Sequence, residues 1–193
     1  KLVKQARFKT PSACVEDIVY LPDRKLSRDR IARYAECDWV EKCEVMVIIS
    51  KTGGGKSYLC QALGNAACRK LIEVRYTRLA GICEELNRAR AAADGSYYEL
   101  MDGLKTIPLL LVDDFMTTPI TTQNAVDLFE IMEARESLAA TLIASQLEPN
   151  EWYLRIEGEL MADSILNRIA TGARYIDLEG PNMREYFAKK KVG

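Results

Sequence analysis

The chain has 193 residues, of which 48% are hydrophobic and 28% are charged, and its formal net charge is −1. This composition is typical of a globular protein with a hydrophobic core, and it excludes a protein that binds nucleic acid through overall basicity. Any contact with DNA must therefore depend on a local group of basic residues. No apolar run reaches the length of a membrane span and no signal peptide is visible, so we expect a cytoplasmic protein without a membrane partner.

Histidine is absent from the sequence, and cysteine occurs six times. The absence of histidine excludes Ser-His and Cys-His nucleophilic triads, as well as the metalloproteases that bind zinc through a His-Glu-x-x-His helix. No two cysteines have the Cys-x-x-Cys spacing of a zinc site. We therefore expect reduced thiols in a cytoplasmic protein.

Basic residues surround Phe8 near the start of the chain. We expect residues 1–26 to form a basic N-terminal linker or arm, and a solvated tail fits these residues equally well. Residues 27–39 have the apolar spacing of an amphipathic helix, with Ser27 as its N-cap. The folded domain is therefore predicted to span residues 27–193.

The most informative stretch begins with an apolar run at residues 44–49, which predicts a buried strand. Three glycines follow, then Lys56 and Ser57, and then a helical pattern. This order of strand, glycine-rich loop and helix is that of a P-loop, in which backbone N–H groups and the helix N-terminus surround a phosphate. The alternative is a glycine-rich turn before a helix that starts with lysine; the preceding strand and the Lys-Ser pair favour the P-loop.

Within this loop, we expect Lys56 to contact the β- and γ-phosphates of ATP and the Ser57 hydroxyl to hold Mg²⁺. The P-loop consensus begins with glycine, whereas this chain has Ser50 there, a small residue for which we expect a small cost. The residues predicted to bind the nucleotide are Thr52, Gly53, Gly54, Gly55, Lys56, Ser57 and Tyr58.

Strands and helices alternate along the rest of the chain, which predicts a parallel sheet with helices on both faces. We expect strands at residues 74–77, 108–115, 140–145 and 174–178, and helices at 58–70, 79–91, 97–105, 121–137 and 162–171. The inner face of the helix at 121–137 is predicted to consist of Ala125, Val126, Phe129 and Met132.

A continuous apolar run ends in Asp113 and Asp114, in the form of a Walker B strand that is covered on both faces. Asp113 would hold Mg²⁺, usually through water, and Asp114 would orient or deprotonate the attacking water. Asp114 is expected to be a weaker base than the usual glutamate, because its side chain is one methylene shorter. Gln146 follows the strand at 140–145 and would contact the γ-phosphate or its water, with a loop-capping amide as the alternative.

Taken together, these motifs resemble IstB, the AAA+ ATPase that helps insertion-sequence transposases and is related to the DnaC and DnaI helicase loaders. The motifs follow one another along nearly the whole chain, at residues 50–57, 113–114, 141–152, 162–168 and 179–184. The resemblance implies that residues 27–193 form an AAA+ ATPase domain of three α/β/α layers, with a five-stranded parallel sheet and no separate lid domain. It also implies that the small N-terminal domain found ahead of such ATPase cores is missing.

The resemblance further implies roles for individual residues. Gln146 falls at the sensor 1 position, and Arg168 matches the arginine finger that reaches the ATP of a neighbouring subunit. Arg184 corresponds to a second arginine sensor. Arg88 and Arg90 are the candidates for a DNA path, and the alternative is that they only interact with the dipole of their helix. The predicted catalytic residues are Lys56, Asp114, Gln146 and Arg168.

The function implied is that of an ATP-binding and ATP-hydrolysing protein that forms a homo-oligomer on double-stranded DNA and helps or regulates a transposase. Hydrolysis would need Mg²⁺, would be weak in a monomer and would be stimulated by DNA and oligomerisation. One alternative is a DnaC-like loader of a replicative helicase. Another is an adaptor that senses ATP and scarcely hydrolyses it, because Ser50, Asp114 and Gln146 depart from the consensus.

Overall fold

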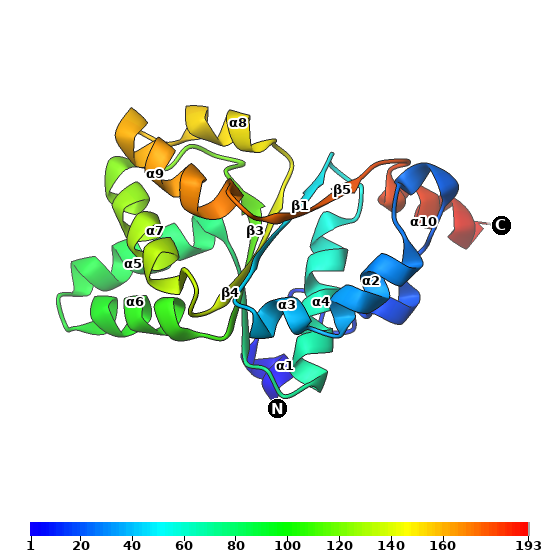
Figure 1. Ribbon diagram of the computed structural model, residues 1–193, viewed down its shortest axis with the longest axis horizontal. Helices are drawn as coiled ribbons and strands as arrows, with labels where there is room; N and C mark the ends of the chain where they lie inside the picture. The colour runs from blue at the N-terminus through cyan, green and yellow to red at the C-terminus, as the bar shows by residue number, and fades with distance from the viewer. Residues whose placement is uncertain (193) are drawn as a thin grey trace.

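A computed structural model describes residues 1–192 of the chain. Its centre is a five-stranded sheet in the order β2-β3-β4-β1-β5, and every neighbouring pair of strands is parallel (Figure 1). The strands are β1 (Val45–Ser50), β2 (Val74–Arg78), β3 (Leu109–Phe115), β4 (Ala140–Ser145) and β5 (Arg174–Leu178). The predicted parallel sheet is therefore confirmed, and each predicted strand lies within a residue or two of its observed bounds.

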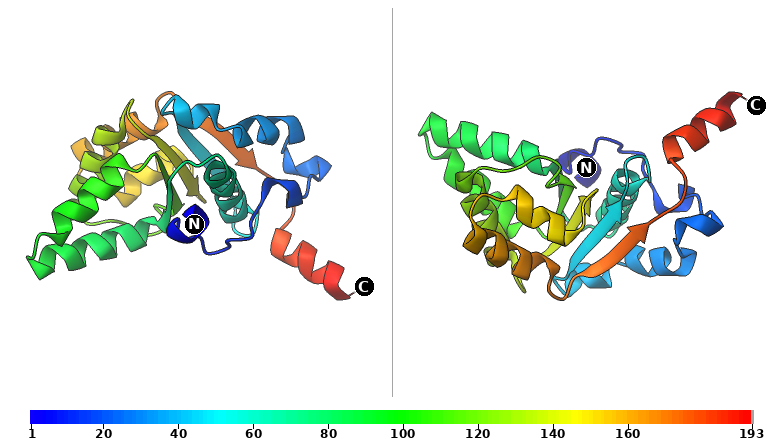
Figure 2. Two further views of the ribbon diagram at one scale, coloured as in Figure 1. Left: turned by 90° about the horizontal axis from the view of Figure 1, so that it is seen from below. Right: turned by 90° about the horizontal axis from the view of Figure 1, so that it is seen from above.

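Helices cover both faces of the sheet, and Figure 2 shows the sheet between them. On one face lie α1 (Leu2–Gln5), α2 (Arg28–Ala35), α3 (Asp38–Glu41) and α4 (Lys56–Arg69). On the other face lie α5 (Leu79–Ala92), α6 (Ser96–Thr106), α7 (Thr122–Arg135), α8 (Pro149–Trp152) and α9 (Glu159–Ala170). Short 3-10 helices occur at Val15–Asp17, Pro22–Arg24 and Tyr153–Arg155.

Strand β1 shows why the sheet is buried on both sides. Met46 and Ile48 pack into the core beneath α4, while Val47 and Ile49 pack into the core beneath α5, α7 and α9. Alternating side chains of a strand point to opposite faces, so an uninterrupted apolar run fills two cores at once. The predicted three-layer α/β/α fold is confirmed.

The predicted helix at 27–39 is interrupted. Ser27 caps α2 as predicted, because its hydroxyl accepts a hydrogen bond from the Arg30 N–H. The helix ends at Ala35, and Cys37 adopts a left-handed conformation with φ of 65° before α3 begins. This turn lets the indole of Trp39 sink into the core and donate to the Tyr34 carbonyl at 2.9 Å.

The N-terminal segment was expected to be a linker or arm, but the structure shows it packed on the core. Ala6 and Ala13 are completely buried, and Phe8 is almost so. The Ala6 carbonyl accepts a hydrogen bond from the Tyr76 N–H at 2.8 Å, and the Asn65 side chain donates to the carbonyls of residues 11 and 13. Apolar residues rather than the surrounding cations decide where this segment lies, because burying them stabilises the fold.

At the other end of the described chain, β5 leads into α10 (Met183–Val192), which projects away from the body of the protein (Figure 2). The predictions included no helix here, because the segment is rich in lysine and lacks apolar periodicity. None of the helices within residues 1–192 is both long and apolar enough to span a bilayer.

Candidate nucleotide-binding site

The glycine-rich loop connects β1 to α4 in a tight, closed conformation. Gly53 and Gly55 have φ angles of 83° and 96°, which favour glycine over other residues. A β-carbon on Gly54 would lie 1.9 Å from Ser50 Oγ, so a larger residue here would displace this hydroxyl or the loop. Ser50 itself is the last residue of β1 and pairs with Leu178 without a positive φ, so the departure from consensus introduces no backbone strain.

Two of the predicted catalytic residues, Lys56 and Asp114, come from different elements and lie close together at this loop. Lys56 is the first residue of α4, and its Nζ lies 3.4 Å from Asp114 Oδ1. Asp114 has a φ of 49° and lies in an irregularity of the β3–β4 register between Val112 and Phe115. A bulge of this kind turns a side chain out of the strand's regular alternation, and here it directs Asp114 toward Lys56.

Asp113 lies beneath this pair and is only 2% exposed. Its Oδ1 accepts from the Asp114 N–H and its Oδ2 accepts from the Tyr76 hydroxyl, both at 2.8 Å. Burial, together with the charge of Asp113, raises the pKa of Tyr76, so the hydroxyl stays protonated and remains a donor. Among the side chains that the structure describes, none forms an ion pair with Asp113.

A buried carboxylate without a cationic partner is costly unless a positive ion approaches it. Together with the Ser57 hydroxyl, which lies in the first turn of α4, Asp113 supplies oxygen ligands of the kind that Mg²⁺ prefers. The residues present therefore fit a magnesium ion.

Gln146 also reaches the loop. It directly follows β4, and its Oε1 accepts a hydrogen bond from Thr52 Oγ1 at 2.6 Å. The structure therefore brings Gln146 to the same loop as Lys56 and Asp114.

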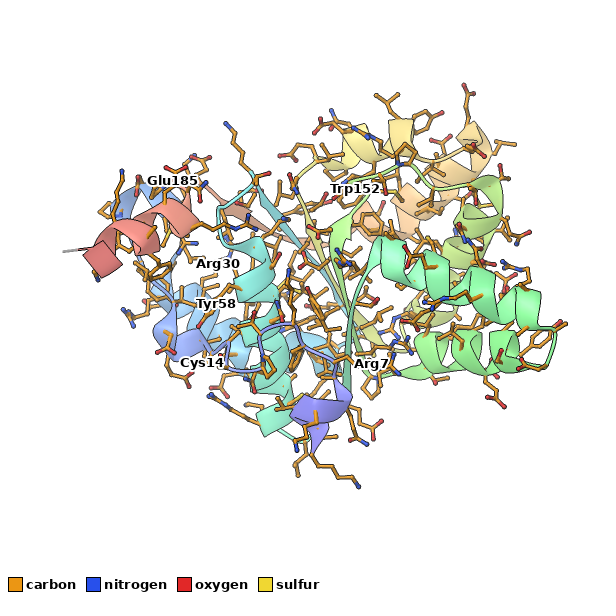
Figure 3. All side chains as sticks on the ribbon, turned by 180° about the vertical axis from the view of Figure 1, so that it is seen from behind. Arg7, Cys14, Arg30, Tyr58, Trp152 and Glu185 are labelled. Carbon is orange, nitrogen blue, oxygen red and sulfur yellow. The ribbon has the colours of Figure 1, made fainter. Side chains whose placement is uncertain are left out.

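A cavity of about 240 Å³ opens beside the first turn of α4, and most of its lining is apolar. Its walls come from the N-terminal segment, α4 and α10, namely Asp17, Ile18, Val19, Arg24, Leu26, Gly55, Tyr58, Leu59, Met183 and Phe187. The ring of Tyr58, a predicted nucleotide-binding residue, forms part of the wall, while its hydroxyl reaches the backbone of Cys14 (Figure 3). The sequence did not predict this cavity, because its walls come from segments at opposite ends of the chain.

Arg24 was also missed, and it ties the N-terminal segment to the loop. Its guanidinium is buried and donates to the carbonyls of Val19 at 2.6 Å and Gly54 at 2.8 Å. Burial lowers the pKa of Arg24, and its Nε has no hydrogen-bond partner among the described residues. The position of Arg24 therefore fixes one wall of the cavity against the loop.

The remaining predicted arginines lie elsewhere. Arg168 on α9 donates to Glu133 Oε1 at 2.9 Å and stacks over the ring of Phe129, both on α7. Arg90 donates to both carboxylate oxygens of Asp127 at 2.7 Å, so it serves an ion pair within the protein rather than an open DNA surface. Arg88 and Arg184 remain exposed.

A glycine-rich loop between β1 and α4, two acidic residues at the end of β3 and an amide after β4 define a P-loop NTPase of the AAA+ class. The family model described as "IstB-like ATP binding protein" matches residues 1–191. The chain therefore belongs to the IstB-like ATP-binding proteins.

Individual relatives agree with this assignment. The chain is 35% identical over 192 residues to the insertion-sequence ATP-binding protein y4pL of Sinorhizobium fredii (strain NBRC 101917 / NGR234), covering 98% of this chain and 78% of the relative. A crystal structure of DnaI superposes with a TM-score of 0.72 at 22% identity, covering 90% of this chain and 91% of DnaI.

The replication initiator DnaA bound to AMPPCP and single-stranded DNA superposes with a TM-score of 0.74 at 19% identity, covering 94% of this chain. The chain spans about half of that DnaA chain, 55% of its length. At these identities, DnaA and DnaI support the fold alone.

Proposed function

We propose that this protein binds ATP with Mg²⁺, hydrolyses it at a site shared between two protomers, and assembles on double-stranded DNA to help or regulate a transposase. The observation that carries this proposal is the meeting of Lys56, Asp114 and Asp113 at the mouth of the glycine loop. Membership of the IstB-like family and the insertion-sequence origin of y4pL support the transposition role.

The nucleotide would lie along the loop. Backbone N–H groups of residues 53–57 would surround the phosphates at the N-terminus of α4, and Lys56 would contact the β- and γ-phosphates. The apolar cavity beside the loop suits an aromatic base, with Ile18, Tyr58 and Met183 around it. Ser57 and Asp113 would hold Mg²⁺, which neutralises charge on the phosphates when bound.

Asp114 is the residue proposed to orient or deprotonate the attacking water. In the described structure its carboxylate is paired with Lys56, and a triphosphate would compete for that lysine because it carries more negative charge. Nucleotide binding would thereby free Asp114 to accept a hydrogen bond from water. Gln146, which contacts Thr52 across the loop, would help to place the same water or the γ-phosphate.

Arg168 would complete the site from a neighbouring protomer. In its own chain the Arg168 side chain is 24% exposed and paired with Glu133 on α7, so it is not directed at the glycine loop of its own protomer. An arginine finger is worth about 10³–10⁵ in rate. A monomer is therefore expected to bind ATP and to hydrolyse it slowly, with turnover rising when DNA brings protomers together.

The second candidate function is that of an ATP sensor that does not hydrolyse ATP. It is favoured by the short side chain of Asp114 and by the ion pair between its carboxylate and Lys56. Turnover with and without duplex DNA separates the two: a sensor would bind ATP and show no DNA-stimulated hydrolysis. The third candidate function is that of a loader of a replicative helicase. In a pull-down, a loader would bind a hexameric helicase, whereas the proposed transposition protein would bind a transposase.

Substitution of Lys56 by alanine tests the nucleotide site itself. We expect the affinity for a fluorescent ATP analogue to fall at least tenfold in Lys56→Ala, because the substitution removes the charge that contacts the phosphates. Lys70→Ala is the matched control, since Lys70 caps the other end of α4 and pairs with the exposed Glu36. Unchanged affinity in Lys56→Ala would refute the proposed site.

A further inference from the structure

Tyr76 is joined to Asp113 by a hydrogen bond between neighbouring strands. In the β2–β3 register Arg78 lies opposite Asp113 and Tyr76 lies opposite Leu111, so Tyr76 and Asp113 are diagonal neighbours. Diagonal pairs on parallel strands lie on the same face, and a tyrosine is long enough to reach across. Its hydroxyl is 2.8 Å from Asp113 Oδ2, and the two residues are 7% and 2% exposed.

The two hydrogen-bond donors to Asp113 fix the orientation of its carboxylate. The Asp114 N–H binds Oδ1 and the Tyr76 hydroxyl binds Oδ2, so each oxygen keeps its remaining lone pair in a defined direction. The first donor is part of the backbone and belongs to any residue at position 114. The second donor is a side chain and can be removed on its own.

Tyr76 is itself held by the N-terminal segment. Its backbone N–H donates to the Ala6 carbonyl at 2.8 Å, and its ring packs against Phe8 with centroids 6.2 Å apart at an angle of 57°. Residues 6–8 therefore support the strand and the ring from which the hydroxyl reaches Asp113.

We propose that Tyr76 is a positioning residue for the magnesium-binding carboxylate Asp113, and that Phe8 keeps its hydroxyl in place. This inference rests on the proposed nucleotide site and adds to it a residue that does not touch the nucleotide. Partners that orient a metal ligand typically change metal affinity 10–100-fold when they are removed. A residue that only fills the core would change stability and leave the magnesium requirement unaltered.

Tyr76→Phe in the full chain tests the proposal, because it removes only the hydroxyl. Tyr97→Phe is the matched control, since the Tyr97 hydroxyl donates to the buried Asp127 at 3.0 Å on the far side of the sheet. The measurement is the Mg²⁺ concentration that gives half-maximal binding of a fluorescent ATP analogue. Electron paramagnetic resonance with Mn²⁺ and a non-hydrolysable ATP analogue reports metal binding directly.

We expect Tyr76→Phe to raise the Mg²⁺ and Mn²⁺ requirement about tenfold and to leave metal-free nucleotide binding unchanged. Tyr97→Phe should show the wild-type requirement. In an Asp113→Asn background, Tyr76→Phe should add little, because the hydroxyl acts through that carboxylate.

An unchanged metal requirement in folded Tyr76→Phe overturns the proposal, as does an equal loss of binding with and without metal. Should Tyr76→Phe fail to fold, Phe8→Leu decides, because it keeps the hydroxyl and loosens its support. The proposal requires that Phe8→Leu raise the Mg²⁺ concentration needed for half-maximal binding, and a wild-type concentration overturns it. Failure of the nucleotide site as a whole is recognised separately, by unchanged binding in Lys56→Ala.

Discussion

Gly54 offers a sharp test of how the glycine loop is built. Its φ is not in the left-handed region, so alanine is allowed there by the backbone. The obstacle is Ser50, because an added β-carbon would lie 1.9 Å from Ser50 Oγ, whereas real β-carbons stay at least 3.0 Å from such atoms. In Gly54→Ala the Ser50 hydroxyl or the loop itself must therefore move by about 1 Å.

Overpacking of this kind costs about 1–3 kcal/mol. If the displaced loop amides lose that much of their interaction with the phosphates, the affinity for ATP falls about 5- to 150-fold. Titration of a fluorescent ATP analogue in excess Mg²⁺ measures this directly. Thermal unfolding of the same variant shows whether the domain remains folded.

Ser50→Gly should rescue the defect. It removes the hydroxyl and the β-carbon that the new methyl group meets, and of the three nearest atoms it leaves the Lys51 carbonyl at 3.2 Å. The double variant should therefore regain most of the wild-type affinity. Gly103→Ala is the control, because a β-carbon there meets nothing within 4 Å. Wild-type affinity in Gly54→Ala, or a double variant as weak as the single one, would refute this reasoning.

Three further predictions concern other parts of the chain. Arg90→Met leaves Asp127, which is 1% exposed, without its cation, and should lower the free energy of unfolding by about 3 kcal/mol in urea titrations; a loss below about 1 kcal/mol contradicts this. Arg168→Ala should abolish DNA-stimulated ATP turnover and preserve nucleotide affinity; a large drop in affinity argues against a role in trans. The hydrogen bond from Arg174 lowers the pKa of Glu44, so the pair stabilises the fold above the ordinary carboxyl pKa and loses this effect as the pH falls. In Arg174→Gln the free energy of unfolding should therefore fall less steeply as the pH is lowered through the carboxyl pKa. An unchanged pH dependence would show that this ion pair does not contribute.

The strands and the glycine loop were predictable because they depend on local pattern. Strands β1, β3 and β4 are short apolar runs that end in loop or polar residues, and β5 was predicted with its observed bounds. The helix α7 begins where the sequence predicts, and Thr121 caps it by accepting a hydrogen bond from the Asn124 N–H. The Walker-type acids could be placed at the correct edge of the sheet, because parallel strands share that edge.

The inner face of α7 was only partly predicted. Ala125 and Met132 are buried as expected, while Val126 and Phe129 are half-buried. The buried residues of α7 also include the charged Asp127 and Arg135, each of which has partners distant in sequence. A hydrophobicity pattern assigns such charged residues to the surface. Arg135 donates to the carbonyls of Leu104 and Ile107, which no local pattern reveals.

The N-terminal contacts were unpredictable for the same reason. Arg24, Phe8 and the lining of the cavity act through segments brought together only by the fold. Their one local signal was a small set of apolar residues among the cations of residues 1–26.

The first turn of helix α10 contacts the glycine loop. The Met183 N–H donates to the Gly53 carbonyl at 2.8 Å, Met183 and Phe187 form one side of the cavity, and the rest of the helix extends into solvent (Figure 2). A small rotation of the first turn of α10 therefore displaces the far end of the helix by a larger distance. We expect a ligand in the cavity to change the orientation of α10, so a spin or fluorescent label near Lys189 should report whether the cavity is occupied.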